Sequence, residues 1–242
     1  MKNIKVSIIT PCYNSEKTIE KTLLSVLNQT YQNYEYIIID GGSVDGTLDI
    51  VRKYAEQFEG KLHLISEKDN GIYDAMNKGV GMATGELIGI VNSDDWYEAD
   101  AIENILDKYS GAEYEVVYGM LRNINLDGEE KSVVFYNHIF LEEKMINHPT
   151  CFITRQTYED FGKYSTEYKS SADYAYLLKL MDSKKVVFTP IYKIISNFRV
   201  GGMSASMTGY RETLKIKLDR GVISKKKYYF LMAKSRLRGL FH

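Results

Sequence analysis

Two adjacent aspartates, Asp94 and Asp95, carry the clearest chemical potential in this sequence of 242 residues. They follow an apolar run at 87–91, which predicts a buried strand. Neighbouring carboxylates repel each other, so a fold that keeps them together usually supplies a cation. The expected arrangement is Mg²⁺ or Mn²⁺ on one or two carboxylates, with water and substrate phosphates in the other positions. Such a metal would stabilise the charge that develops on a diphosphate leaving group.

Both this pair and a third carboxylate, Asp173, have simpler interpretations as well. Capping needs only one side chain, so Asp94 or Asp95 alone could cap the helix expected to start near Glu98. Asp173 falls in the first turn of another predicted helix, where it complements the helix dipole by about 0.3–1 kcal/mol. Its alternative role is that of a general base, which removes a proton from an attacking hydroxyl.

His148 and Arg199 are weaker candidates, and the sequence leaves their roles open. His148 precedes a predicted strand and could contact an acceptor or a metal, or be an ordinary half-buried histidine. Arg199 precedes the stretch 201–204, which is either a flexible lid over a phosphate or a plain turn.

The elements that position these residues follow from the apolar pattern. Four short β-branched runs, at 6–9, 36–39, 62–65 and 87–91, alternate with helical periodicity. Strands that are apolar on both faces and separated by helices predict a mostly parallel sheet with helices on both sides. Ligands of such sheets bind beyond the carboxyl ends of the strands. We therefore expect one crevice lined by the polar strand-end residues Thr10, Asp40, Asp69, Asp94 and Asp95.

The second half of the chain is less regular. A turn at Asp127-Gly128 between apolar runs at 116–120 and 132–135 predicts a hairpin, and 150–154 and 186–188 are further strand candidates. We expect a single α/β domain over 1–208, with a nucleotide-binding half at 1–110 and an acceptor-binding half at 111–208. A basic helical segment at 209–242 follows it.

The charge is distributed unevenly. The whole chain has a net charge of −1, but residues 210–242 hold ten Lys or Arg against two Asp or Glu. A mildly acidic body with a basic tail argues against nucleic acid as a partner. Basic residues interleaved with aromatic ones in the tail suit an interfacial helix on an anionic membrane surface, and a solvated helix packed on the domain fits equally well. The two cysteines are expected to be reduced thiols in the cytosol.

Two common nucleotide-binding motifs are missing. The sequence has no Gly-x-x-x-x-Gly-Lys-Ser/Thr phosphate loop. The first strand is followed by Pro11-Cys12-Tyr13-Asn14, and not by the glycine-rich turn of a dinucleotide site.

Four successive motifs resemble glycosyltransferase family 2, and together they span about the first hundred residues. They are the runs Val6–Asn14, Ile39–Thr47, Glu67–Gly79 and Ala83–Glu86 with Asn92-Ser93-Asp94-Asp95. Later segments, His148-Pro149-Thr150, Ala172-Asp173-Tyr174 and Phe198–Ser204, resemble bacterial surface-polysaccharide members. The sequence departs from the commoner pattern at Asn92, where an additional aspartate often stands.

The resemblance implies a GT-A, Rossmann-like fold and a nucleoside-diphosphate sugar donor, with a UDP-sugar favoured. It assigns the donor nucleotide to Pro11, Tyr13, Asp40, Asp69, Asn77 and Asp94. By the same resemblance Asp94 and Asp95 would bind Mn²⁺ or Mg²⁺, and Asp173 would be the general base.

The expected function is therefore inverting transfer of a hexose or aminosugar to a saccharide on a polyprenyl diphosphate, for O-antigen or capsule. The enzyme would be cytoplasmic and peripheral to the inner membrane. Two rivals remain. A nucleotidyltransferase would need a glycine-rich loop with a lysine after the first strand, and a non-catalytic sugar-nucleotide binder would dispense with Asp173.

Overall fold

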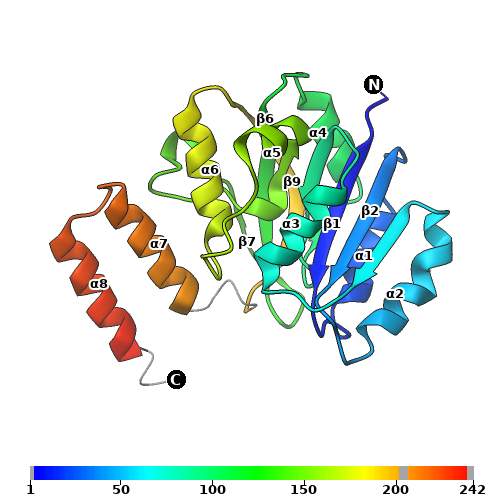
Figure 1. The fold of residues 1–242 in the computed structure, drawn as a ribbon, viewed down its shortest axis with the longest axis horizontal. Coiled ribbons are helices and arrows are strands. Elements are labelled where there is room, and N and C mark those ends of the chain that lie inside the picture. The colour runs from blue at the N-terminus through cyan, green and yellow to red at the C-terminus, as the bar shows by residue number, and fades with distance from the viewer. Residues whose placement is uncertain (1–2, 202–206, 239–242) are drawn as a thin grey trace.

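A computed structural model describes residues 3–201 and 207–238 of the chain. Its centre is one sheet with the strand order β3-β2-β1-β4-β8-β6-β9-β5, and β7 pairs with β6 beside it (Figure 1). The predicted α/β class is confirmed, since helices cover both faces of this sheet.

The first half of the sheet is parallel. It consists of β1 (Val6–Cys12), β2 (Tyr34–Asp40), β3 (Leu62–Ser66) and β4 (Leu87–Ile90). Every residue of β1, β2 and β4 is buried, which explains why these strands read as continuous apolar runs. All four predicted strands are present, but β1 continues through Pro11 to Cys12, two residues predicted to follow the strand. Cys12 at the end of β1 lies opposite Asp40 at the end of β2.

Two hydrophobic cores attach the helices. On one face lie α1 (Ile19–Leu27), α2 (Thr47–Ala55) and α4 (Ala101–Lys108). On the other lie α3 (Ile72–Met82), α5 (Arg155–Phe161) and α6 (Ala172–Ser183). Short 3₁₀ turns occur at Glu56–Phe58, His138–Phe140 and His148–Thr150. The predicted helix containing Asp173 is α6.

The second half of the sheet mixes directions. Its strands are β5 (Trp96–Tyr97), β6 (Glu115–Ile124), β7 (Glu130–Val134), β8 (Cys151–Thr154) and β9 (Val187–Arg199). β8 is antiparallel to β4 and β6, whereas β9 runs parallel to β6. The predicted hairpin is β6–β7. The strand expected only at 186–188 continues to Arg199. The prediction is too short because Pro190 and exposed polar residues interrupt the apolar pattern that reveals other strands.

The C-terminal segment forms two helices, α7 (Met207–Asp219) and α8 (Lys225–Arg238), beside α6 (Figure 1). α7 packs on the domain: the Glu212 carboxylate accepts hydrogen bonds from the backbone N–H groups of Lys169 and Ser170, at 2.8 and 2.9 Å. α8 packs against α7 and leaves Tyr229 and Phe230 each 67% exposed. The predicted boundary at 208/209 therefore falls inside α7. Within the described residues no helix combines the length and apolar character needed to span a bilayer.

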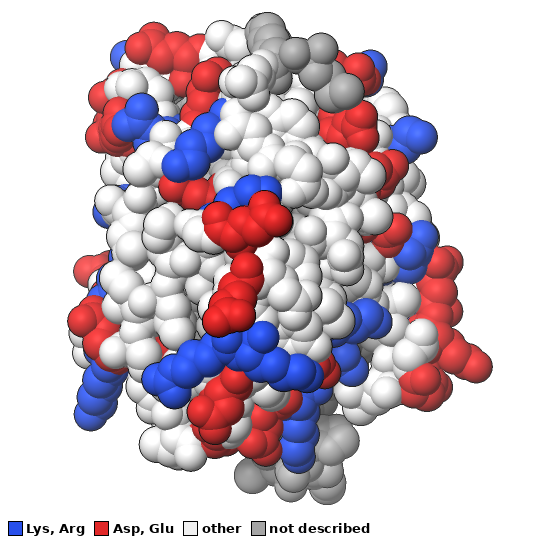
Figure 2. All heavy atoms as spheres, turned by 90° about the vertical axis from the view of Figure 1, so that its right-hand side faces the viewer, with Lys and Arg blue, Asp and Glu red and all other residues white. Residues whose placement is uncertain are grey.

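Charges of both signs are interspersed on the face that lies on the α2 side of the molecule, as Figure 2 shows. Asp and Glu side chains lie next to the Lys and Arg side chains on this face.

Candidate active site

The loops at the carboxyl ends of β1, β2, β3 and β4 meet at one edge of the sheet. The hydroxyls of Ser15 and Ser93 are 2.8 Å apart and join the loop after β1 to the loop after β4. Gly41, after β2, lies so close to the Asp69 carboxylate that a Cβ at this position would be 2.5 Å from Oδ2. The expected convergence of strand ends is confirmed, and glycine at position 41 permits it.

Asp95 is completely buried and anchors its loop. Its Oδ1 accepts a hydrogen bond from the backbone N–H of Arg199 at 3.1 Å, and its Oδ2 accepts one from the Asn92 amide at 3.2 Å. The Thr22 hydroxyl donates to its carbonyl oxygen at 2.6 Å. Burial, with the charge of Asp94 added, raises the pKa of Asp95 well above its usual value. A neutralising charge nearby would therefore stabilise its ionised form.

Asp94 is the more accessible carboxylate of the pair. Burial raises its pKa, and the positive charge of Arg199 opposes the increase. Neither aspartate caps a helix, because α4 begins at Ala101 with Asp100 before it. The capping interpretation is therefore wrong.

The pair fits a divalent cation that arrives with its substrate. Across residues 3–201 and 207–238, no three His, Cys, Asp or Glu side chains come together as a metal site. Mg²⁺ and Mn²⁺ do not need such a cage, since one or two carboxylates plus phosphate oxygens and water satisfy them. Asp94 and Asp95 provide that number of carboxylates, with Asp94 the freer one.

Two cations gather beside these carboxylates around the indole of Trp96. Lys21 Nζ lies 3.3 Å from the ring centroid, and the guanidinium carbon of Arg199 lies 5.8 Å from it. In the described part of the chain neither is paired with a carboxylate, and Arg199 Nε is buried without a hydrogen-bond partner. Burial and the charge of Arg199 lower the pKa of Lys21. An anion between the two cations would relieve their repulsion.

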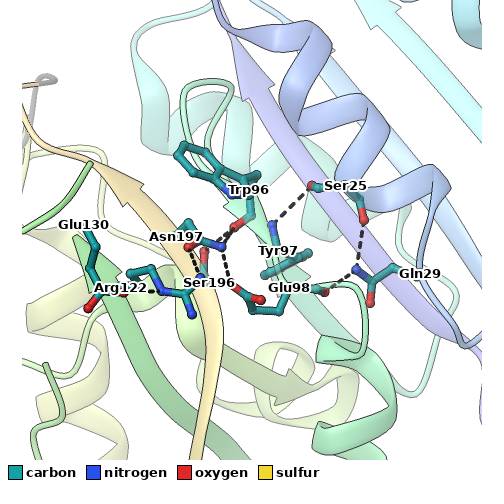
Figure 3. Close-up of polar contacts among 9 residues, drawn as sticks. All are labelled: Ser25, Gln29, Trp96, Tyr97, Glu98, Arg122, Glu130, Ser196 and Asn197. Carbon is teal, nitrogen blue, oxygen red and sulfur yellow. Dashed lines mark hydrogen bonds and ion pairs between the residues drawn. The ribbon is translucent and has the colours of Figure 1, made fainter. Parts of the chain in front are cut away.

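A polar network behind the site fixes β5 between α1 and β9 (Figure 3). The Glu98 carboxylate accepts hydrogen bonds from Arg122 and from Asn197, both at 2.7 Å. The Ser25 hydroxyl accepts a hydrogen bond from the backbone N–H of Tyr97 at 3.2 Å. These hydrogen bonds fix the register of β5 against β9, and hence the positions of Asp95 and Arg199.

The residues predicted to bind the nucleobase lie around the same edge of the sheet, but they differ in burial and in hydrogen bonding. Pro11 is buried in β1, and Tyr13 just after it is exposed. Asp40 is buried and accepts hydrogen bonds from the hydroxyls of Ser43 and Ser66, at 2.5 and 2.7 Å. Burial alone would raise the pKa of Asp40, but these hydrogen bonds bring it below its usual value. Asp40 thus shapes the loop after β2, and Tyr13 is the side chain free to meet a base.

Asn77 is engaged elsewhere. Its amide Nδ2 donates to the carbonyl of Tyr164 at 2.8 Å, and its Oδ1 accepts from the N–H of Tyr164 at 3.0 Å. Asn77 therefore ties α3 to the loop before α6. Its predicted place beside the nucleotide remains a prediction.

Asp173 forms the centre of a second cluster, on the α3 and α6 side of the sheet. Its Oδ1 accepts a hydrogen bond from the Tyr73 hydroxyl at 2.8 Å, and His148 Nδ1 lies 3.1 Å from its Oδ2. Burial alone would raise the pKa of Asp173, but the hydrogen bonds from His148 and Tyr73 hold it below its ordinary value. The carboxylate is therefore ionised near neutral pH.

Tyr73 is the functional candidate that sequence reasoning missed. It belongs to the same motif as Asp69 and Asn77 but lies 100 positions from its partner Asp173. His148 belongs to this second cluster, because its Nδ1 lies 3.1 Å from Asp173 Oδ2.

Comparisons with known proteins agree with this geometry. The Glycosyl transferase family 2 model matches residues 7–162. A PGL/p-HBAD biosynthesis glycosyltransferase of Mycobacterium bovis (strain BCG / Pasteur 1173P2) is 29% identical over 214 residues, which are 86% of this chain and 82% of the relative. A chondroitin synthase of Escherichia coli is 33% identical over 207 residues, which are 84% of this chain but only 30% of that relative.

Solved structures share the fold at low sequence identity. S. aureus TarS 1-349 in complex with UDP-GlcNAc matches with a TM-score of 0.71 and 22% identity, over 88% of this chain and 65% of that one. The mannosyltransferase PcManGT from Pyrobaculum calidifontis, in complex with GDP-Man and Mn²⁺, matches with a TM-score of 0.71 and 19% identity, over 91% and 65%. The predicted GT-A fold is confirmed. Since the family model covers well over half of its length, this chain belongs to glycosyltransferase family 2.

Proposed function

We propose that this glycosyltransferase moves a hexose or aminosugar from a nucleoside-diphosphate sugar to a saccharide acceptor with inversion at the anomeric carbon. The observation that carries the proposal is the separation of two carboxylate centres: Asp94 with Asp95 at the end of β4, and the ionised Asp173 on α6. Single displacement needs one group on the leaving diphosphate and another that takes the proton of the attacking hydroxyl. The two centres suit these two tasks.

On the donor side, Asp94 and Asp95 would hold Mn²⁺ or Mg²⁺, and Asp95 would also fix the loop that carries Asp94. The metal would stabilise charge on the departing diphosphate as a Lewis acid. Arg199 and Lys21, which have no carboxylate partners in the described part of the chain, would bind the same phosphates. The proposed donor is a nucleoside-diphosphate sugar, with a UDP-sugar favoured. Proteins of similar fold have been solved with UDP-GlcNAc and with GDP-Man, which supports a nucleotide sugar of either kind.

For the acceptor we propose a saccharide on a polyprenyl diphosphate, in O-antigen or capsule biosynthesis at the cytoplasmic face of the inner membrane. The similarity to chondroitin synthase supports a saccharide acceptor. α8 supports membrane contact, because Lys225, Lys226 and Lys227 begin a helix that exposes Tyr229 and Phe230. Basic and aromatic residues together favour binding to anionic lipid.

The experiment is transfer from UDP-sugars to synthetic lipid-linked saccharides, with the anomeric configuration of the product determined by NMR. Inversion is expected, and a retained configuration would contradict the proposal.

Asp173→Asn should abolish transfer and leave donor binding intact. EDTA should suppress transfer, and Mn²⁺ should restore it. Equal donor affinity of Asp94→Ala and the wild type in Mn²⁺ would exclude Asp94 as the ligand.

A further inference from the structure

The helix that carries Asp173 has no side-chain cap of its own. Ser171 precedes α6 at the N-cap position, yet its side chain makes no hydrogen bond to the first turn of that helix. The Ser171 hydroxyl instead donates to the Gly209 carbonyl of α7 at 3.1 Å, and it lies 3.2 Å from the Thr213 hydroxyl. Helix ends fray, and a cap opposes this, so the position of Asp173 depends on contacts from outside α6.

Glu212 on α7 makes the charged contacts to this end of α6. The segment 162–171 before α6 is irregular, and two backbone N–H groups near its end point to the Glu212 carboxylate. Oε1 accepts from Lys169 at 2.8 Å, and Oε2 accepts from Ser170 at 2.9 Å. Hydrogen bonds to a charged acceptor are about twice as strong as neutral ones. One carboxylate therefore fixes the backbone three positions before Asp173.

The side chain of Asp173 is held by two other elements. Its Oδ1 accepts from the Tyr73 hydroxyl of α3, and its Oδ2 lies 3.1 Å from His148 Nδ1, in the turn before β8. An α-helix rotates by about 100° per residue, so both contacts require the first turn of α6 to begin at a fixed place. Tyr73 and His148 thus orient the carboxylate, and α7 holds the backbone that presents it.

We propose, on the basis of the inverting transfer proposed above, that Glu212 is a positioning residue for the Asp173 base. Through the backbone of Lys169 and Ser170, it keeps the carboxylate within hydrogen-bond reach of the acceptor hydroxyl, as general-base catalysis requires. α7 then belongs to the active site, although the sequence predicts residues 209–242 as a segment that follows the catalytic domain.

The other end of α7 has an anchor that does not contact this segment. The Arg220 guanidinium, just after α7, donates to both carboxylate oxygens of Asp182, at 2.6 and 2.7 Å, and to Glu142 at 3.1 Å. Asp182 lies near the end of α6, nine positions or about 14 Å along the helix from Asp173. α7 therefore runs in the same direction as α6, with Glu212 at the end that carries the base and Arg220 at the opposite end.

Glu212→Ala tests the positioning role. Displacement of a reacting group by about 1 Å can cost about 10²-fold in rate, so kcat should fall by about 10–100-fold. The Kd for UDP should stay unchanged, because the donor loops lie at the ends of β1 to β4. Initial rates at saturating donor and acceptor give kcat, and calorimetry with UDP and Mn²⁺ gives Kd.

Glu212→Gln guards the test against a folding defect. The glutamine preserves the volume of the side chain, but its NH₂ group faces one of the two backbone N–H donors that the carboxylate accepted. It should also lower kcat at an unchanged Kd for UDP, and it replaces Glu212→Ala if that protein does not fold.

Arg220→Ala is the matched control. It removes the ion pairs at the opposite end of α7, so it should lower Tm and keep kcat within twofold of the wild type. A loss in kcat below tenfold in the folded Glu212 variant would overturn the proposal. So would an equal loss in Arg220→Ala, or a loss in kcat matched by weaker UDP binding, because Glu212 would then only support the fold.

The wild type in the same assay keeps the two proposals apart. If the wild type fails to transfer, or retains configuration, the proposed function fails whatever the Glu212 variants do. If it inverts and Glu212→Ala matches it, only the positioning role of Glu212 fails.

Discussion

Glu35→Gln tests the scaffold that brings the donor-side loops together. Glu35 lies in β2, and its carboxylate accepts hydrogen bonds from the Ser7 hydroxyl of β1 at 2.5 Å and the Lys5 ammonium at 2.6 Å. The backbone N–H of Thr84, just before β4, donates at 2.6 Å. One buried carboxylate thus joins the three strands whose ends carry Tyr13, Asp40 and Asp94.

The magnitude follows from the pKa of Glu35. Burial would raise it, but the hydrogen bonds from Lys5, Ser7 and Thr84 lower it from 4.5 to about 2. This shift of ~2.5 units corresponds to about 3 kcal/mol of folding free energy. A carboxylate whose pKa is lowered by folding contributes its full stabilisation at pH values above its pKa in the unfolded chain, near 4.5. That stabilisation is lost as the pH falls towards 2.

We therefore expect Glu35→Gln to lower the free energy of unfolding at pH 7 by about 2–3 kcal/mol, or Tm by about 5–10 °C. The difference from the wild type should shrink by about half at pH 3, because Glu35 is then protonated in the unfolded chain and has to lose its proton on folding. Urea unfolding of both proteins at pH 7 and pH 3 measures this difference in the free energy of unfolding. Glu20→Gln, at an exposed carboxylate beside Lys53, is the control and should change stability much less. A difference that stays equal at pH 7 and pH 3 would refute the argument from charged hydrogen bonds.

Two further predictions concern the reaction. Lys21→Ala and Arg199→Ala should each raise the Kd for a UDP-sugar. The increase should be about 10-fold or more for Arg199→Ala, because the guanidinium would make a charged hydrogen bond to phosphate. Calorimetry in the presence of Mn²⁺ measures both values. Unchanged affinity in both variants would remove the cations around Trp96 from the donor site. Tyr73→Phe deletes a hydrogen bond that lowers the pKa of Asp173, so the acid limb of the kcat profile should move to higher pH. An unmoved limb would leave Tyr73 without influence on the base.

The donor side of the site was predictable because its determinants are local. A buried parallel strand shows itself as a continuous apolar run, and the polar residue that ends it marks the edge where ligands bind. Asp40 ends the buried β2 and Asp94 follows the buried β4, whereas Asp69 follows β3, which is partly exposed. Periodicity could not decide which of Asp94 and Asp95 is buried. That depends on the backbone of Arg199, 104 positions further along, at the end of a strand whose pattern is too irregular to reveal its length.

The acceptor side depends on contacts that no local pattern encodes. From the sequence, Asp173 has a plausible helix-dipole role, and the segment around His148 resembles family members but leaves the role of the histidine open. The structure changes this by joining three elements: Tyr73 at the start of α3, His148 before β8 and Asp173 at the start of α6. The helix-dipole role and the catalytic role of Asp173 are compatible, because the first turn of α6 faces this cluster. Variants of Asp94 should therefore impair donor binding, whereas variants of Asp173 should impair transfer with the donor still bound.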